Sequence, residues 1–120
     1  MYISEFDKAE IRQIVEKQLQ AFQKDDFIAA FSFASPSIQQ QFGTWDNFKQ
    51  MVISSYRAVY RPRAVIFGSF SLVENFPAQT LTIMDFYGNI IQATYVMQQQ
   101  SDFSWRIHGC FLSPTDKTLK

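Results

Sequence analysis

Pro62 marks an abrupt change in this chain of 120 residues, because residues before it follow a helical spacing and residues after it follow a strand spacing. The residue before a proline disfavours the helical region of backbone space, so the helical half ends by Arg61. From Arg63 onward β-branched and aromatic residues dominate. This order predicts an α+β domain in which N-terminal helices pack on a curved four-stranded antiparallel sheet.

Length and composition indicate one domain over residues 1–120. Eleven basic residues balance eleven acidic ones, which argues against a nucleic-acid partner. One Cys and one His are too few for a zinc site or a disulfide framework, so we expect no metal and no cofactor. The N-terminus lacks a secretory pattern, and the longest apolar stretch, 27–34, is far shorter than the roughly twenty residues of a membrane span. We therefore expect a cytoplasmic protein that does not enter a membrane.

The first helix is predicted to begin at Asp7. Its carboxylate can accept free backbone amides, and Glu10 lies three residues later, as in a capping box. Phe6 and Ile11 then occupy the positions of a hydrophobic staple. Apolar residues at helical spacing give this helix one buried stripe.

Three further helix starts are predicted before Pro62. Asp25 or Asp26 caps a short apolar helix, and Ser35 followed by a proline starts the next one. Gly43 ends that helix, and Thr44 caps a fourth helix. The fourth helix is expected to carry one apolar side through Phe48, Met51, Val52, Tyr56 and Val59.

Four strands are predicted at about 63–74, 78–87, 90–98 and 104–112. Gly88-Asn89 is typical of a two-residue hairpin turn, since both residues tolerate positive φ. That turn would place Ile91 opposite Phe86, and so align Phe86 with Tyr95 on one face of the sheet.

A loop of odd length around Ser101-Asp102 would place Trp105 and Ile107 on the face of Tyr95, towards the helices, whereas an even loop would divide the apolar set. We prefer the odd loop. The opposite face then mixes polar and apolar side chains, and a second subunit covering it would explain its apolar content, so we expect a homodimer. This mixed face contains Asp85, Gln92, Thr94, Arg106, His108, Ile83, Val96 and Leu112.

Four motifs carry a resemblance to a known family: FASP, QFGT, YRPR and WRI-x-GC. Together, from about residue 11 to residue 112, the chain resembles a bacterial family called domain of unknown function 4864. That family looks like a member of the nuclear transport factor 2-like superfamily, a cone-shaped α+β fold. Its relatives include ketosteroid isomerase, scytalone dehydratase, polyketide cyclases and non-catalytic adaptors. The resemblance implies the fold, but it transfers no catalytic residue.

A basic stretch with interleaved tyrosines adjoins Pro62. The guanidinium groups of arginines and the hydroxyls of tyrosines can bind a carboxylate or a phosphate at the mouth of such a cone. The alternative is a solvated connection that pairs with the more acidic helical half. The candidate ligand-binding residues here are Tyr56, Arg57, Tyr60, Arg61 and Arg63.

His108 and Asp85 are two further candidate ligand-binding residues, because both fall on the mixed face. A histidine oriented by a carboxylate is a workable general base near neutral pH. The alternative is a hydrogen-bonded histidine in a dimer interface. Cys110 has no partner in the chain and is interpreted as a small buried hydrophobe. No residue is assigned a catalytic role.

We therefore expect a dimeric, non-enzymatic domain that binds a small ligand, such as an anion, or a protein partner. An isomerase, dehydratase or cyclase acting on an apolar small molecule is one alternative, and a purely structural dimerisation module is another. An open cavity of about 300 Å³ or more with a few convergent polar groups would favour the first two functions. A cone filled by its own side chains would favour the third.

Overall fold

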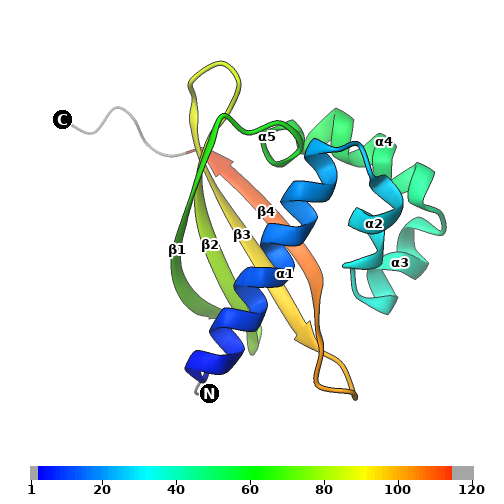
Figure 1. Ribbon diagram of the computed structural model, residues 1–120, viewed down its shortest axis with the longest axis vertical. Coiled ribbons are helices and arrows are strands. Elements are labelled where there is room, and N and C mark those ends of the chain that lie inside the picture. The colour runs from blue at the N-terminus through cyan, green and yellow to red at the C-terminus, as the bar shows by residue number, and fades with distance from the viewer. Residues whose placement is uncertain (1–2, 115–120) are drawn as a thin grey trace.

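The computed structural model describes residues 3–114 and confirms the α+β architecture (Figure 1). The strands follow chain order across one antiparallel sheet. Helix α1 crosses one face of this sheet, and α2, α3 and α4 gather beside β4 (Figure 1). The helices are α1 (Glu5–Gln23), α2 (Phe27–Ser32), α3 (Pro36–Phe42), α4 (Trp45–Ser55) and α5 (Arg57–Tyr60), and the strands are β1 (Ala64–Val73), β2 (Phe76–Met84), β3 (Ile90–Gln99) and β4 (Trp105–Pro114).

Helix α1 begins earlier than the sequence predicted. Ser4, and not Asp7, is its N-cap, and the Ser4 hydroxyl accepts the backbone amide of Asp7 at 3.0 Å. Serine and aspartate cap equally well, so the earlier residue starts the helix and Asp7 lies in the first turn, where a negative charge is favourable. The predicted staple is also wrong, since Phe6 is largely exposed.

The other predicted helix boundaries are confirmed up to α4. Asp26 caps α2, Ser35 caps α3, Gly43 ends α3 with a φ of 80°, and Thr44 caps α4. The fourth helix does not run on to Val59. It ends at Ser55, and Tyr56 adopts a non-helical backbone conformation before the short helix α5.

The hairpin between β2 and β3 differs from the predicted two-residue turn. Met84 pairs with Ile90, so residues 85–89 form the connection. The Asp85 carboxylate accepts the amides of Tyr87 and Asn89, and only Gly88 of the two predicted turn residues has a positive φ. Pairing is therefore displaced by an odd number of residues, which reverses the faces of β2. Ile83 lies in the core, and Asp85 lies in the turn.

Strand β4 contains a β-bulge at His108. Ile107 pairs with Met97 and Gly109 pairs with Val96, which leaves His108 as the extra residue. Strand alternation reverses at this point, so Leu112, predicted on the mixed face, packs against the core instead. Cys110 likewise packs against the core, and Phe111 becomes mostly exposed.

The free edge of β4 is partly covered by the segment 33–35. The Ile107 amide donates to the Phe33 carbonyl at 2.7 Å, and the Ser35 amide donates to the Ile107 carbonyl at 2.8 Å. Arg106 adds a side-chain bond to the Ala34 carbonyl. These bonds satisfy an otherwise unpaired strand edge and hold the start of α3 against β4.

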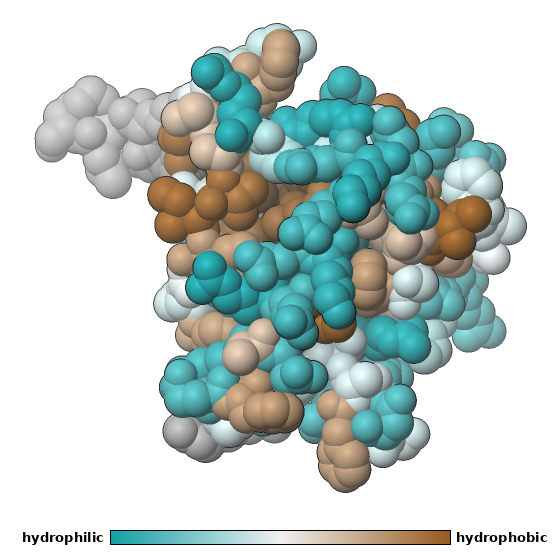
Figure 2. All heavy atoms as spheres, viewed as in Figure 1, coloured by the Kyte–Doolittle hydropathy of each residue, from teal (hydrophilic) through white to brown (hydrophobic). Residues whose placement is uncertain are grey.

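The core lies between α1 and the sheet. The predicted odd loop is confirmed, because Gln99 pairs with Trp105 across residues 100–104, and Trp105, Ile107 and Tyr95 are all buried against the helices. The outward side of α1 carries hydrophilic side chains (Figure 2). Within residues 3–114, no helix combines the length and the apolar character needed to cross a membrane.

Gly68 generates a prediction about this sheet. It lies at an irregularity in β1, and a Cβ added there would meet Thr80 Oγ1 at 2.8 Å and the Thr80 carbonyl oxygen at 3.3 Å. We expect Gly68→Ala to lower the free energy of unfolding by about 1–3 kcal/mol. The control Gly109→Ala places its Cβ 3.9 Å from Val96 and should change stability by less than about 0.5 kcal/mol. Urea titration of both variants measures this, and equal stabilities would contradict the close approach.

Candidate functional site

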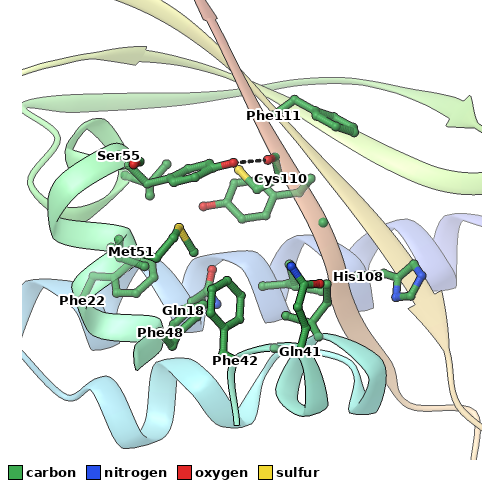
Figure 3. A pocket seen from close by; sticks show the side chains of 18 residues that line it. Gln18, Phe22, Gln41, Phe42, Phe48, Met51, Ser55, His108, Cys110 and Phe111 are labelled. Carbon is green, nitrogen blue, oxygen red and sulfur yellow. Dashed lines mark hydrogen bonds between the residues drawn. The ribbon is translucent and has the colours of Figure 1, made fainter. Parts of the chain in front are cut away.

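A cavity of about 710 Å³ lies between the helices and the β3–β4 half of the sheet (Figure 3). Helix α4 contributes residues at helical spacing, so that Phe48, Met51 and Val52 face inward together. Helix α3 contributes Phe42, and the bulged part of β4 forms the opposite wall. Most of the lining is aromatic or aliphatic.

Gln18 brings an amide into this apolar wall. It occupies the apolar stripe of α1 and is only 4% exposed. Its Nε2 donates to the Ala30 carbonyl at 3.0 Å, which ties α1 to α2. Its side-chain oxygen points towards the cavity (Figure 3). Gln18 therefore offers a fixed hydrogen-bond acceptor at the cavity wall.

Two tyrosines and a thiol meet at the sheet side of the cavity. The Tyr56 hydroxyl donates to the Cys110 carbonyl at 2.9 Å (Figure 3). The Tyr95 hydroxyl is fully buried and has no hydrogen-bond partner among residues 3–114. Burial raises the pKa of both hydroxyls, that of Tyr95 well above its ordinary value. All three groups are neutral at physiological pH, because burial also raises the pKa of the Cys110 thiol to about 12.

His108 stands at the edge of the cavity, where the bulge turns its ring towards the start of α3. Its Nδ1 lies 2.8 Å from Ser35 Oγ, and its ring lies 5.0 Å from that of Phe76. Ser35 Oγ also accepts the Ile38 amide and lies 3.4 Å from Ser37 Oγ. The histidine thus joins β4 to α3.

The cavity wall carries no Asp, Glu, Lys or Arg among the described residues. Nor does any cluster of three or more His, Cys, Asp or Glu within residues 3–114 have the arrangement of a metal site. A charged ligand in this cavity would have no opposite charge to offset its desolvation.

The structure divides the predicted site residues into two groups. Tyr56 and His108 line the cavity. The other residues of the basic stretch lie outside its lining, with Arg57 and Arg63 exposed on either side of Arg61. Tyr60 and Arg61 instead contact Asp25 in the connection between α1 and α2.

Asp25 is the anionic partner of the basic stretch. It accepts from the Tyr60 hydroxyl at 2.5 Å and from Arg61 Nη2 at 3.0 Å. The Tyr60 hydrogen bond, aided by the Arg61 charge, lowers the pKa of Asp25. Arg61 Nη1 also donates to the Phe22 carbonyl at 2.7 Å. These contacts join α5 to the end of α1, which matches the alternative of a connection that pairs with the acidic helical half.

Asp85 and His108 do not form the hypothesised pair. The Asp85 carboxylate binds backbone amides of its own hairpin, including that of Asn89 at 2.8 Å, while the His108 ring binds Ser35. The face assignment that joined them depended on the two-residue turn, which the observed register excludes.

Gln18, Tyr95 and Cys110 are among the cavity residues that the sequence analysis did not assign to a ligand site. Gln18 carried a signal, because it interrupts the apolar stripe between Val15 and Phe22 with an amide. Tyr95 was placed only in the core, and Cys110 was interpreted as a hydrophobe. Their meeting depends on the β4 bulge, which strand alternation does not reveal.

One family model matches residues 4–119, and its description reads domain of unknown function, DUF4864. Searches of curated proteins and of solved structures return no match to the chain.

The two cavity tyrosines should differ in their effect on stability. Tyr56→Phe removes the bond to the Cys110 carbonyl and should lower the free energy of unfolding by about 1–2 kcal/mol. Tyr95→Phe removes a buried hydroxyl that makes no hydrogen bond, so stability should stay equal or rise by up to about 1 kcal/mol. Urea denaturation compares the two variants. A loss for Tyr95→Phe as large as that for Tyr56→Phe would mean that the Tyr95 hydroxyl has a partner.

Proposed function

The chain belongs to the DUF4864 family, and we propose that it is a binding protein for an uncharged, largely apolar small molecule held in the cavity between helices and sheet. The observation that carries this proposal is an apolar space of about 710 Å³ bordered by a few polar groups. That volume lies within the roughly 300–1,000 Å³ that is typical of small-molecule pockets. It therefore favours a ligand-binding function over a purely structural one.

The lining supports a neutral ligand over an anion. Arg57, Arg61 and Arg63 all lie outside it, and Arg61 is engaged by Asp25. Burying a charge without a partner is far more costly than burying a hydrogen-bonded polar group. Anion binding by the basic stretch would thus occur at a separate, exposed position.

The cavity chemistry also supports binding over catalysis. Proton abstraction near neutral pH needs a base of suitable pKa in contact with the substrate. No carboxylate lines the cavity within the described residues, and the thiol of Cys110 is protonated. His108 lies at the edge of the cavity, but its Nδ1 is bonded to Ser35. An isomerase, dehydratase or cyclase remains the second candidate, with His108 as its base.

Two further expectations belong to this proposal. Helices on one face of a four-stranded antiparallel sheet, with a cavity between the two layers, support the resemblance to the nuclear transport factor 2-like superfamily. The unpaired Cys110 suits a reducing compartment, which supports a cytoplasmic location in a bacterium.

The helix-free face of the sheet supports a homodimer as part of the same proposal. Ile66 on β1 pairs with Thr82, and Phe111 on β4 pairs with Thr94, so both belong to this face. Ile66 is 68% exposed and Phe111 is mostly exposed. Exposed apolar side chains on a sheet face are typical of a protein interface, and a second copy is its occupant here.

A matched pair of dyes tests the cavity proposal. N-phenylnaphthylamine is neutral, and anilinonaphthalene sulfonate adds an anionic group to the same skeleton. We expect the neutral dye to bind at least tenfold more tightly, because no Lys or Arg of residues 3–114 lines the cavity. Met51→Trp fills the cavity and should weaken binding of the neutral dye at least tenfold. Fluorescence titration measures both dissociation constants.

Gln50→Trp is the control for the cavity-filling variant, since Gln50 lies on α4 but is exposed and outside the cavity lining. It should leave dye binding unchanged. Equal binding to both Trp variants would contradict a ligand in the cavity. Tighter binding of the sulfonate, lost in Arg61→Ala, would instead support the anion site of the basic stretch.

The dimer is tested by Ile66→Lys, which would bury a lysine in the interface. We expect this variant to be monomeric at micromolar concentration, whereas the unmodified chain scatters light as a dimer. Ile28→Lys is the matched control, because Ile28 is 63% exposed on α2 and distant in the fold from the sheet face. A monomeric unmodified chain, or dissociation by both variants, would refute this interface.

A further inference from the structure

We propose that the ligand of this cavity carries a hydrogen-bond acceptor, of the ketone or aldehyde class, that receives the proton of the Tyr95 hydroxyl. This inference deepens the proposed function and rests on it. It begins from the one buried side-chain oxygen or nitrogen that lacks a hydrogen-bond partner among residues 3–114, which is Tyr95 Oη. A buried hydroxyl without a partner is destabilising, and native proteins rarely retain one.

Packing alone does not explain why residue 95 carries a hydroxyl group. Phenylalanine at this place would fill the same volume and leave no polar atom unsatisfied. Tyr95 is 1% exposed, belongs to the core, and lines the cavity at the same time. Its neighbour Tyr56 shows the contrast, because that hydroxyl is satisfied by the Cys110 carbonyl. Among residues 3–114, Tyr95 Oη is therefore the fully buried polar atom at this wall whose hydrogen bond a ligand would complete.

The chemistry of the neighbours selects an acceptor on the ligand. The Cys110 thiol lies close enough to the Tyr95 hydroxyl to raise its pKa through a weak interaction of hydrogen-bond type, but the contact does not have the geometry of a hydrogen bond. Sulfur is a weak acceptor, so a ligand oxygen would bind this hydroxyl in preference to the thiol. Burial raises the pKa of Tyr95 well above its ordinary value, so the hydroxyl keeps its proton and acts as a donor. A carbonyl oxygen is the matching group, and it is uncharged, as the lining requires.

Gln18 limits where that carbonyl can lie. Its side-chain oxygen points towards the cavity from α1 (Figure 3) and would repel another acceptor, whereas Tyr95 lines the cavity from β3. The ligand is thus oriented with its carbonyl towards the sheet and its apolar body among the aromatic side chains of α3 and α4. One donor and one acceptor on opposite walls distinguish the two ends of the ligand.

Four dissociation constants test this inference. The probes are acetylnaphthalene and ethylnaphthalene, which share a skeleton and differ by a carbonyl oxygen, and the proteins are the unmodified chain and Tyr95→Phe. For each protein we compare the dissociation constant of acetylnaphthalene with that of ethylnaphthalene. In Tyr95→Phe we expect this ratio to rise by about tenfold, because the ketone loses its hydrogen bond while ethylnaphthalene binds as well or better. Tyr87→Phe is the matched control, since Tyr87 is exposed in the β2–β3 hairpin, and it should leave the ratio unchanged.

The infrared carbonyl band of bound acetylnaphthalene is a second, independent measurement on the unmodified chain. A hydrogen bond from Tyr95 lowers its frequency relative to the ketone in an apolar solvent, and the band should return in Tyr95→Phe. An unshifted band overturns the Tyr95 contact. So does an unchanged ratio when both probes bind the unmodified chain and both bind Met51→Trp more weakly, and in that case the proposed cavity function still stands. Failure of both probes to bind overturns the proposed function and this inference together.

Discussion

One extra residue in β4 determines what the cavity contains. His108 has no pairing partner on β3, so β4 contains a β-bulge between Ile107 and Gly109. The alternation of side chains between the two faces of the sheet reverses at this bulge. Before the bulge, Ile107 packs against the helices, and after it Cys110 takes that orientation. The same bulge presents the His108 ring to Ser35, which caps α3. The wall of the cavity and the helix that borders it are therefore positioned by a single irregularity.

The polar groups described at the cavity wall are all uncharged, and two of them also form hydrogen bonds within the protein. Gln18 holds α2 through its nitrogen, and Tyr56 holds β4 through its hydroxyl. Charged side chains are used elsewhere, as in the pairing of Arg61 with Asp25 at the surface. This separation gives the cavity a low polarity, in which a single hydrogen bond to a ligand is worth more than it would be in water. Selectivity can then depend on very few contacts.

The sequence predicted those features that depend on neighbouring residues. Asp26, Ser35 and Thr44 each cap a helix through an amide three residues away, so residue type alone identifies them. Residue types did not predict the β2–β3 register. The Asp85 carboxylate accepts two amides of its own hairpin, and this forms a longer connection than the predicted Gly88-Asn89 turn. In the candidate site, Tyr56 and His108 were predicted as ligand-binding residues from their residue types, and both line the cavity. Tyr95 was not, because a missing partner is visible only when all surrounding groups are in place.

Strand β4 would take part in both proposed interactions through alternating residues. Cys110 and Leu112 pack towards the helices, while Phe111 between them belongs to the helix-free face. A dimer formed through that face would fix the position of Phe111, and the backbone would carry this restraint to the neighbouring Cys110, whose carbonyl holds Tyr56. A second copy bound on one side of the sheet would thereby stiffen the wall of the cavity on the other. An ordered wall lowers the entropy lost on binding, so dimerisation would strengthen ligand binding without contributing a residue to the cavity.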